Sequence, residues 1–300
     1  RDSSVTGVQT CALPIYFDTV VLGNSRVTYM DVRAMPGNAF NYAVSSMKPP
    51  EFLPYLQFAA SRSTSPIKTV ILGMSFVDTN AAFDVSFDSP EKYIEKATSC
   101  GFRYKSLLNL KLMYHSIDSI RREQQGNYHD AYIWEGVKIP TKRMMLPIPF
   151  EIRQKEIDDS LVTYRNRVYG KDYVYLDNRR LYMEVKKAFP TARFLVFTTP
   201  VSAHLLRLLL EQGLFDYYVR WISDMVEIFG ELWNFMYFNE VTTDDNNYVD
   251  AHHCSPQVCN KIMQKLYGLT GANVSEDFGI KITRENLEGH LKFLKKIFIE

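Results

Sequence analysis

Short apolar runs alternate with segments of helical period along this chain of 300 residues, and this alternation most constrains its fold. The runs have the composition of strands, and the segments between the later runs have the apolar spacing of amphipathic helices. A chain that alternates in this way forms a parallel sheet covered by helices. Five strands are expected, over residues 17–23, 39–44, 68–73, 193–198 and 234–238. The sequence therefore predicts a three-layer α/β domain of flavodoxin-like topology.

The third and fourth predicted strands are separated by more than a hundred residues. An ordinary crossover needs only about a dozen residues, so a helical insertion is expected over about 81–190. The loop over residues 128–150 is rich in Pro, Met and aromatic residues, and forms either a lid beside a pocket or a packed connection. The α/β domain is expected to span residues 17–270. Residues 271–300 are expected to form a C-terminal helical extension.

The chain starts at Arg1 rather than at methionine, and residues 1–15 resemble a translated sequencing adapter. We expect residues 1–16 to be an artefactual or disordered segment left by a truncation. The alternative is a native, loosely ordered arm. A truncation would also have removed any signal peptide or membrane anchor.

Charge and cysteine content exclude several classes of protein. Lysine and arginine number 35 against 34 acidic residues, so no strong field attracts nucleic acid, and a nucleic-acid partner is not expected. The four cysteines are too few for a disulfide scaffold, and no Cys-x-x-Cys pair indicates a zinc ribbon.

Ser25 directly follows the first predicted strand, within Gly23-Asn24-Ser25. This position lies at the carboxyl edge of the sheet, where open α/β folds bind their ligands. A helix starting there would direct backbone N–H groups and its positive dipole end at an oxyanion formed on an ester. The alternative is that Ser25 only caps such a helix.

Asp250 and His253 lie in a loop before the last sheet-packing helix, which Ser255 is expected to cap. Three residues apart in a turn, the carboxylate can accept a hydrogen bond from one ring nitrogen while the other nitrogen faces outward. A serine nucleophile needs such a base with its orienting group. The alternatives are a solvated surface cluster and a metal site.

The metal hypothesis would use His252, His253 and nearby acidic residues, with Cys254 and Cys259 close in sequence. A Cys-x₄-Cys spacing does not match common zinc sites, so no metal is expected.

Taken together, a strand followed by Gly-x-Ser and a late Asp-x-x-His resemble the SGNH, or GDSL-type, hydrolase superfamily over roughly residues 17–268. The resemblance implies that Ser25 is the nucleophile, His253 the general base and Asp250 the group that orients it. It further implies ester hydrolysis or O-acyl transfer without a cofactor.

The Gly23-Asn24-Ser25 block departs from the usual Gly-Asp-Ser and is similar to divergent envelope members, such as the D-alanyl transfer protein of teichoic acid synthesis and alginate O-acetylation proteins. This likeness implies an acylated carbohydrate or similar ester as substrate, either a small molecule or a polysaccharide, in a bacterial cell envelope.

The oxyanion donors of the family come from a glycine after the second strand and an asparagine after the third. The corresponding segments read Asn41–Ser45 and Gly73–Phe76, and the asparagine is not in place. The expected donors are the backbone N–H of Ala43, the Ser75 hydroxyl and Asn24. Loss of one donor costs about 10²- to 10³-fold in rate, so the alternative is an inactive carbohydrate-binding or assembly protein of the same fold.

Overall fold

A six-stranded sheet forms the centre of the computed structural model, which describes residues 16–83, 88–107, 110–125, 131–134, 137–140, 147–269 and 274–299. The strand order is β2-β1-β3-β6-β7-β8. The first five strands run parallel, in the order of flavodoxin-like sheets, and β8 pairs antiparallel with β7. Their bounds are β1 Thr19–Gly23, β2 Ala39–Asn41, β3 Thr69–Met74, β6 Arg193–Thr198, β7 Glu231–Asn234 and β8 Ile280–Thr283. The predicted α/β class is confirmed.

The sheet differs from expectation at its C-terminal edge. The fifth strand ends at Asn234, where the prediction had it begin, because the following amides bond to side chains and leave the ladder: Met236 N–H donates to Thr198 Oγ1 and Asn234 Oδ1. Residues 280–283, expected within a helical extension, form β8 instead. A strand of four residues is too short for its period to identify it.

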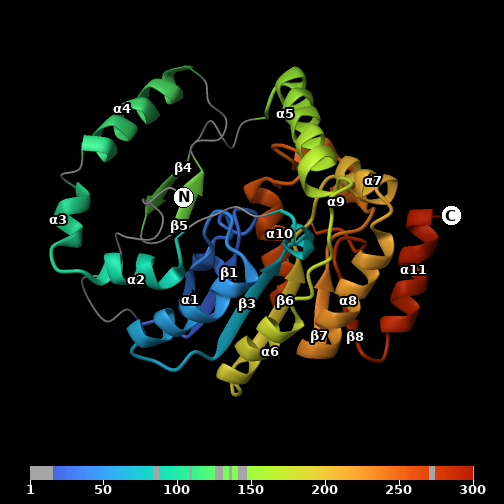
Figure 1. Ribbon diagram of the computed structural model, residues 1–300, viewed down its shortest axis with the longest axis horizontal. Coiled ribbons are helices and arrows are strands. Elements are labelled where there is room, and N and C mark those ends of the chain that lie inside the picture. The colour runs from blue at the N-terminus through green and yellow to red at the C-terminus, as the bar shows by residue number, and fades with distance from the viewer. Residues whose placement is uncertain are drawn as a thin grey trace.

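The two faces of the sheet bury alternate residues of each strand, as a period of two requires. One face packs against a thick layer of α1 (Pro49–Arg62), α6 (Arg179–Ala188), α7 (Ala203–Glu211), α8 (Phe215–Phe229) and α11 (Leu287–Ile299). The other packs against α10 (Pro256–Tyr267) and residues 27–35 (Figure 1). The first face carries Val20, Leu22, Val70, Leu72 and Val196, and the second carries Val21, Ile71, Leu195 and Phe197. The sheet therefore lies between two buried apolar clusters, one on each face.

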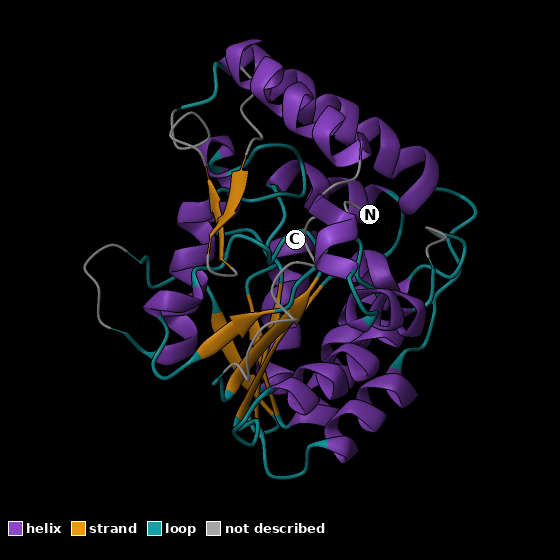
Figure 2. Cartoon of the chain, turned by 90° about the vertical axis from the view of Figure 1, so that its left-hand side faces the viewer, coloured by secondary structure: helices purple, strands orange, loops and turns teal. Residues whose placement is uncertain are grey.

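The insertion between β3 and β6 contains helices and a separate two-stranded ribbon, which stands apart from the main sheet in Figure 2. Its elements are α2 (Pro90–Thr98), α3 (Phe102–Leu107), α4 (Leu110–Gln125), β4 (Ala131–Trp134), β5 (Val137–Pro140), α5 (Phe150–Thr163) and a π-helix, Tyr164–Val168. The ribbon lies within the predicted loop over 128–150. Helix α6 packs on α1 and α8, so it belongs to the main domain and not to the insertion, where the prediction put it.

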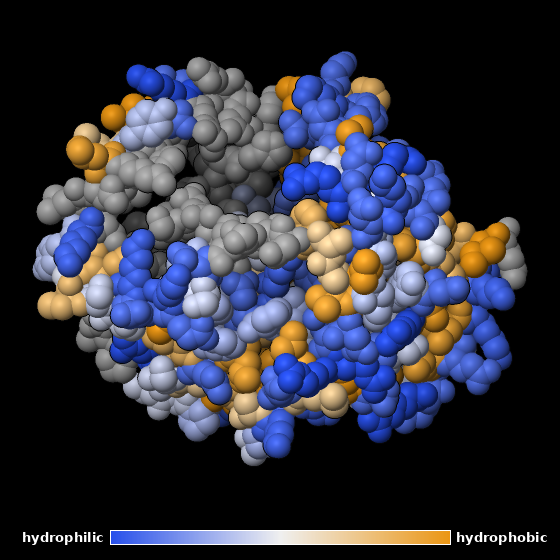
Figure 3. Space-filling model, in the orientation of Figure 1, coloured by the Kyte–Doolittle hydropathy of each residue, from blue (hydrophilic) through white to orange (hydrophobic). Residues whose placement is uncertain are grey.

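Helix α4 exposes several large apolar side chains. Leu110, Met113, Tyr114, Ile117 and Ile120 are all exposed, and apolar groups reach the surface at α4 in Figure 3. None of the helices in the described ranges is both long and apolar enough to cross a membrane.

Residues 1–15 of the predicted N-terminal segment lie outside the described residues.

Candidate active site

Ser25 lies in a tight turn after β1, at the carboxyl edge of the sheet. Backbone N–H groups of Val27, Thr28 and Met30 each donate to the carbonyl three residues earlier. The helix expected here does not form, and the next α-helix begins only at Pro49. The Asn41 amide explains the difference, because it donates to the carbonyls of Val27 and Met30, both at 3.1 Å, which a continuing helix would need for its own N–H groups.

Two glycines on neighbouring strands allow this turn to lie close to the sheet. A Cβ atom on Gly73 would stand 2.3 Å from Cγ2 of Val27 and 2.9 Å from Cζ of Phe197. A Cβ on Gly23 would stand 2.7 Å from the same Val27 methyl, and Gly23 has a φ of +156°. Both approaches are shorter than van der Waals contact, so only glycine permits the observed position of the turn.

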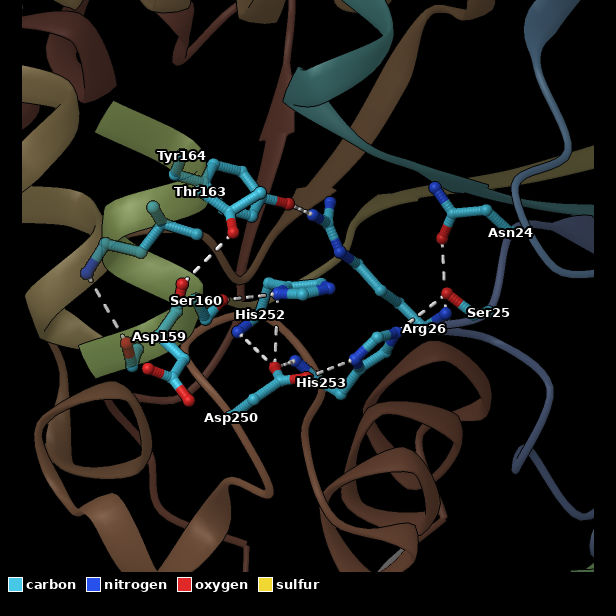
Figure 4. A network of polar contacts seen from close by, with 12 residues as sticks. Asn24, Ser25, Arg26, Asp159, Ser160, Thr163, Tyr164, Asp250, His252 and His253 are labelled. Atoms are coloured by element: carbon cyan, nitrogen blue, oxygen red, sulfur yellow. Dashed lines mark hydrogen bonds and ion pairs between the residues drawn. The ribbon is translucent and has the colours of Figure 1, made fainter. Parts of the chain in front are cut away.

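The structure brings Ser25, His253 and Asp250 into one hydrogen-bonded chain, although Ser25 and His253 are 228 positions apart (Figure 4). Ser25 Oγ lies 2.8 Å from His253 Nε2, and His253 Nδ1 lies 2.6 Å from Asp250 Oδ2. The second carboxylate oxygen of Asp250 accepts the backbone N–H groups of His252 and His253, both at 2.7 Å. The order of these contacts is the one that a serine nucleophile, its base and the group that orients the base would require.

The loop that carries the two histidines is closed by its own backbone. Val249 N–H donates to the carbonyl of His253, and the Ala251 carbonyl accepts the N–H of Ser202, at the start of α7. Ser255 takes the N-cap position of α10, as predicted. Main-chain hydrogen bonds therefore fix the loop that carries His253.

The charges of the site follow from burial and proximity. Burial would raise the pKa of Asp250, but the neighbouring imidazoles of His253 and His252 and the hydrogen bonds from both residues outweigh it and hold that pKa well below its usual range. Burial lowers the pKa of His252 well below its usual value, and the charge of His253 lowers it further. A carboxylate thus faces two imidazoles, of which His252 is neutral.

Helix α5 and the π-helix that follows it in the insertion supply side chains that the sequence did not indicate. Ser160 Oγ lies 3.0 Å from His252 Nδ1, and the Tyr164 ring packs on the His252 ring with 5.1 Å between centroids. Arg26 donates a hydrogen bond to the Tyr164 hydroxyl. Ser160 and Tyr164 are one helical turn apart, which predicts a shared face. No sequence pattern, however, indicates which loop that face would meet.

Arg26, directly after the nucleophile, is a buried cation with only 6% of its surface exposed. Burial lowers the pKa of Arg26, while Tyr164, Tyr169 and the carboxyls of Asp78 and Asp250 raise it, and the net shift is upward. Asp78 lies in the 3₁₀ turn after β3 (Phe76–Thr79), where burial raises its pKa to about 7 despite the opposing charges of Arg26 and Lys48.

The three expected oxyanion donors are engaged elsewhere. Ala43 N–H donates to Asn41 Oδ1 at 3.0 Å, which contradicts its assignment as a free donor. Ser75 is only 2% exposed, and its hydroxyl bonds to Thr199 Oγ1 and accepts the Asn24 amide at 2.8 Å. The sequence could not reveal this, because both bonds depend on neighbouring segments.

The Ser25 backbone N–H has no hydrogen-bond partner within the described residues. Beside it, Val44 N–H donates to Gly23 O at 3.1 Å, which places the turn after β2 next to the nucleophile. Ser46 in that turn has a φ of +57°, a left-handed conformation that non-glycine residues rarely adopt. Strain of this kind is concentrated at functional sites.

Asp250, His252 and His253 also offer ligand atoms that lie within 4.8 Å of one another. His253 Nδ1 and Asp250 Oδ2, at 2.6 Å, have a hydrogen-bond separation, whereas two ligands of a tetrahedral zinc ion lie about 3.3 Å apart. Cys254 and Cys259 are buried against each other, with 3.8 Å between their sulfurs, and do not belong to this group. The observed arrangement fits a hydrogen-bonded triad better than a metal site.

Comparisons of this chain with protein-family models, with curated proteins and with solved structures found no match, so the resemblance to the SGNH superfamily depends on the motifs and the geometry described above.

Proposed function

We propose that this protein is a serine-dependent ester hydrolase or O-acyltransferase of the SGNH type. The single observation that carries the proposal is the chain of short hydrogen bonds from Ser25 through His253 to Asp250. Each member has the partner that its role requires, and the two segments that carry Ser25 and the Asp250–His253 pair are 228 positions apart in sequence at the Ser25–His253 contact.

The reaction would follow from this geometry. Ser25 Oγ attacks the acyl carbonyl while His253 Nε2 takes its proton, and Asp250 stabilises the imidazolium that results. His253 then returns the proton to the departing alkoxide, leaving an acyl group on Ser25. Water or a sugar hydroxyl, deprotonated by His253, attacks this acyl group and frees the serine. Hydrolysis and transfer share the first half and differ only in the acceptor.

Stabilisation of the oxyanion would depend mainly on the Ser25 N–H, together with the turn that contains Ser46. Because Ala43, Ser75 and Asn24 are engaged in other bonds, we expect slow turnover. For the substrate we propose an acylated carbohydrate or similar ester, on the likeness of Gly23-Asn24-Ser25 to envelope members of the superfamily.

The engaged donors also favour a second candidate, an inactive SGNH-type protein that binds carbohydrate or assists assembly in the cell envelope. In that case the triad geometry would persist without an oxyanion site able to support turnover.

A fluorophosphonate probe, which phosphonylates activated serines, separates the two candidates. We expect labelling of the purified protein that is lost in Ser25→Ala. Ser223→Ala, which removes a hydroxyl bonded to the Val219 carbonyl on α8, is the matched control and should label normally. Absence of labelling in the wild-type protein would favour the inactive alternative.

A further inference from the structure

His252, beside the proposed base, contacts both the triad and the insertion. Its Nδ1 lies 3.2 Å from Asp250 Oδ1 and 3.0 Å from Ser160 Oγ. Its ring stands 4.0 Å from the His253 ring and 5.1 Å from the Tyr164 ring, measured between centroids. Figure 4 shows it between helix α5 and the carboxylate.

The tautomer of His252 follows from its neighbours. A lone pair on Nδ1 would face the Asp250 carboxylate and repel it, so Nδ1 carries the proton. That N–H donates to the Ser160 hydroxyl oxygen, while Nδ1 also stands 3.2 Å from Asp250 Oδ1. Asp250 Oδ1 therefore accepts two backbone N–H groups and lies in close contact with this ring nitrogen.

The neutrality of His252 matters because the neighbouring ring becomes a cation during the proposed reaction. Two positive imidazoles at this separation would repel each other strongly. A neutral ring with its proton on Nδ1 keeps a favourable contact with the Asp250 carboxylate without that repulsion. Tyr164, which covers the His252 ring, is itself held by the Arg26 guanidinium. The contacts thus form a ring that starts and ends at the Ser25-Arg26 segment.

We propose that His252 is a positioning residue: held by Ser160 and Tyr164 of the insertion, it fixes Asp250 and thereby the orientation of the His253 ring. The inference depends on the proposed function, and it assigns the insertion a role in setting the reactivity of Ser25. His252 itself touches neither the nucleophile nor the proton in transit.

Four variants test this role. His252→Leu removes the donor, while His252→Asn retains an N–H near the position of Nδ1. Ser160→Ala removes the hydroxyl from the insertion. Thr163→Val is the matched control on the same helix, since the Thr163 hydroxyl bonds only to the Asp159 carbonyl among the described residues. The readouts are the rate of fluorophosphonate labelling at Ser25 and the low-field proton resonance of His253 Nδ1–H.

We expect His252→Leu to slow labelling about 10- to 100-fold and to shift or broaden the resonance, because a misplaced base loses its alignment. Ser160→Ala should act in the same direction with a smaller effect and carries the test if His252→Leu does not fold. His252→Asn should restore most of the rate, and Thr163→Val should leave both readouts unchanged.

Wild-type labelling rates and an unchanged resonance in both His252→Leu and Ser160→Ala would overturn the inference while leaving the proposed function intact. If Ser25 is not labelled in the wild-type protein, the proposed function fails. The resonance then still decides the positioning role: a change in His252→Leu but not in Thr163→Val supports it, and no change overturns it.

Discussion

The two halves of the candidate site contrast in how they are built. In the half proposed to handle protons, the side chains of Ser25, His253 and Asp250 bond to one another in series. In the oxyanion half, the side chain of Asn41 that fixes the turn after β1 also takes the Ala43 N–H. The Asn41 side chain that fixes the turn after β1 thus also binds the N–H that was expected to stabilise an oxyanion. In the proposed enzyme, activation of Ser25 and stabilisation of the oxyanion would therefore depend on different groups.

The largest expected effect concerns the first half. Asp250→Asn should lower the rate of labelling at Ser25 by about 10⁴-fold, because the amide cannot hold His253 in the productive tautomer. Asp245→Asn is the control and should have little effect on labelling. Asp245 lies five residues before Asp250, and its carboxylate bonds to His204 on α7. Near-normal labelling of Asp250→Asn would contradict this expectation, because it would mean that His253 does not need the Asp250 carboxylate.

A smaller effect is expected in the second half. Asn24→Ala should slow labelling by less than about tenfold, because its amide is already bonded to Ser75. The free energy of unfolding should fall by about 1–3 kcal/mol as Ser75 loses a buried partner. Kinetics and urea denaturation measure the two quantities. A rate loss of about 10²- to 10³-fold with unchanged stability would instead identify Asn24 as an oxyanion donor.

The smallest effect concerns pH, because two buried titratable groups beside the site, Asp78 and His252, have pKa shifts in opposite directions. Burial raises the pKa of Asp78 to about 7, so its contribution to stability is greatest below about pH 4 and declines as the pH rises to about 7. His252 has a lowered pKa, so its contribution is complete above about pH 6.5 and declines as the pH falls.

Between about pH 4.5 and 6.5, Asp78→Asn should therefore make the unfolding free energy rise more steeply with pH, by up to about 1.4 kcal/mol per pH unit. His252→Asn should change the slope in the opposite direction by a similar maximum. Urea denaturation at several pH values measures both slopes. A change of the same sign in both variants would contradict the opposite pKa shifts of Asp78 and His252.

Sequence reasoning located the triad residues because their signals are local. Ser25 follows a recognisable strand, and Asp250 and His253 have a spacing that lets them meet in a turn. The contacts of Ser160 and Tyr164 could not be inferred, since they depend on where a long insertion returns to the sheet. Ala43 was misassigned because a backbone N–H carries no sequence signal of whether a neighbouring side chain already binds it.

The same division applies to the fold. Long, continuous apolar runs such as β3 and β6 were predicted near their observed ranges. The short strand β8 is not predicted from the sequence. The predicted range of β7 begins too late, because the apolar run after Asn234 belongs to a side-chain network around Thr198 and Asn234.

The turn that carries Ser25 packs closely on Gly23 and Gly73, and this packing determines how substitutions at these glycines would act. Neither glycine contributes a side-chain group to the proposed chemistry, yet one added methyl on β3 would meet Val27 and lift the segment that carries Ser25. A variant at residue 73 would therefore resemble an enzyme with a damaged active site while every reacting group was still present. The defect of such a variant would be a shift of Ser25 away from the sheet.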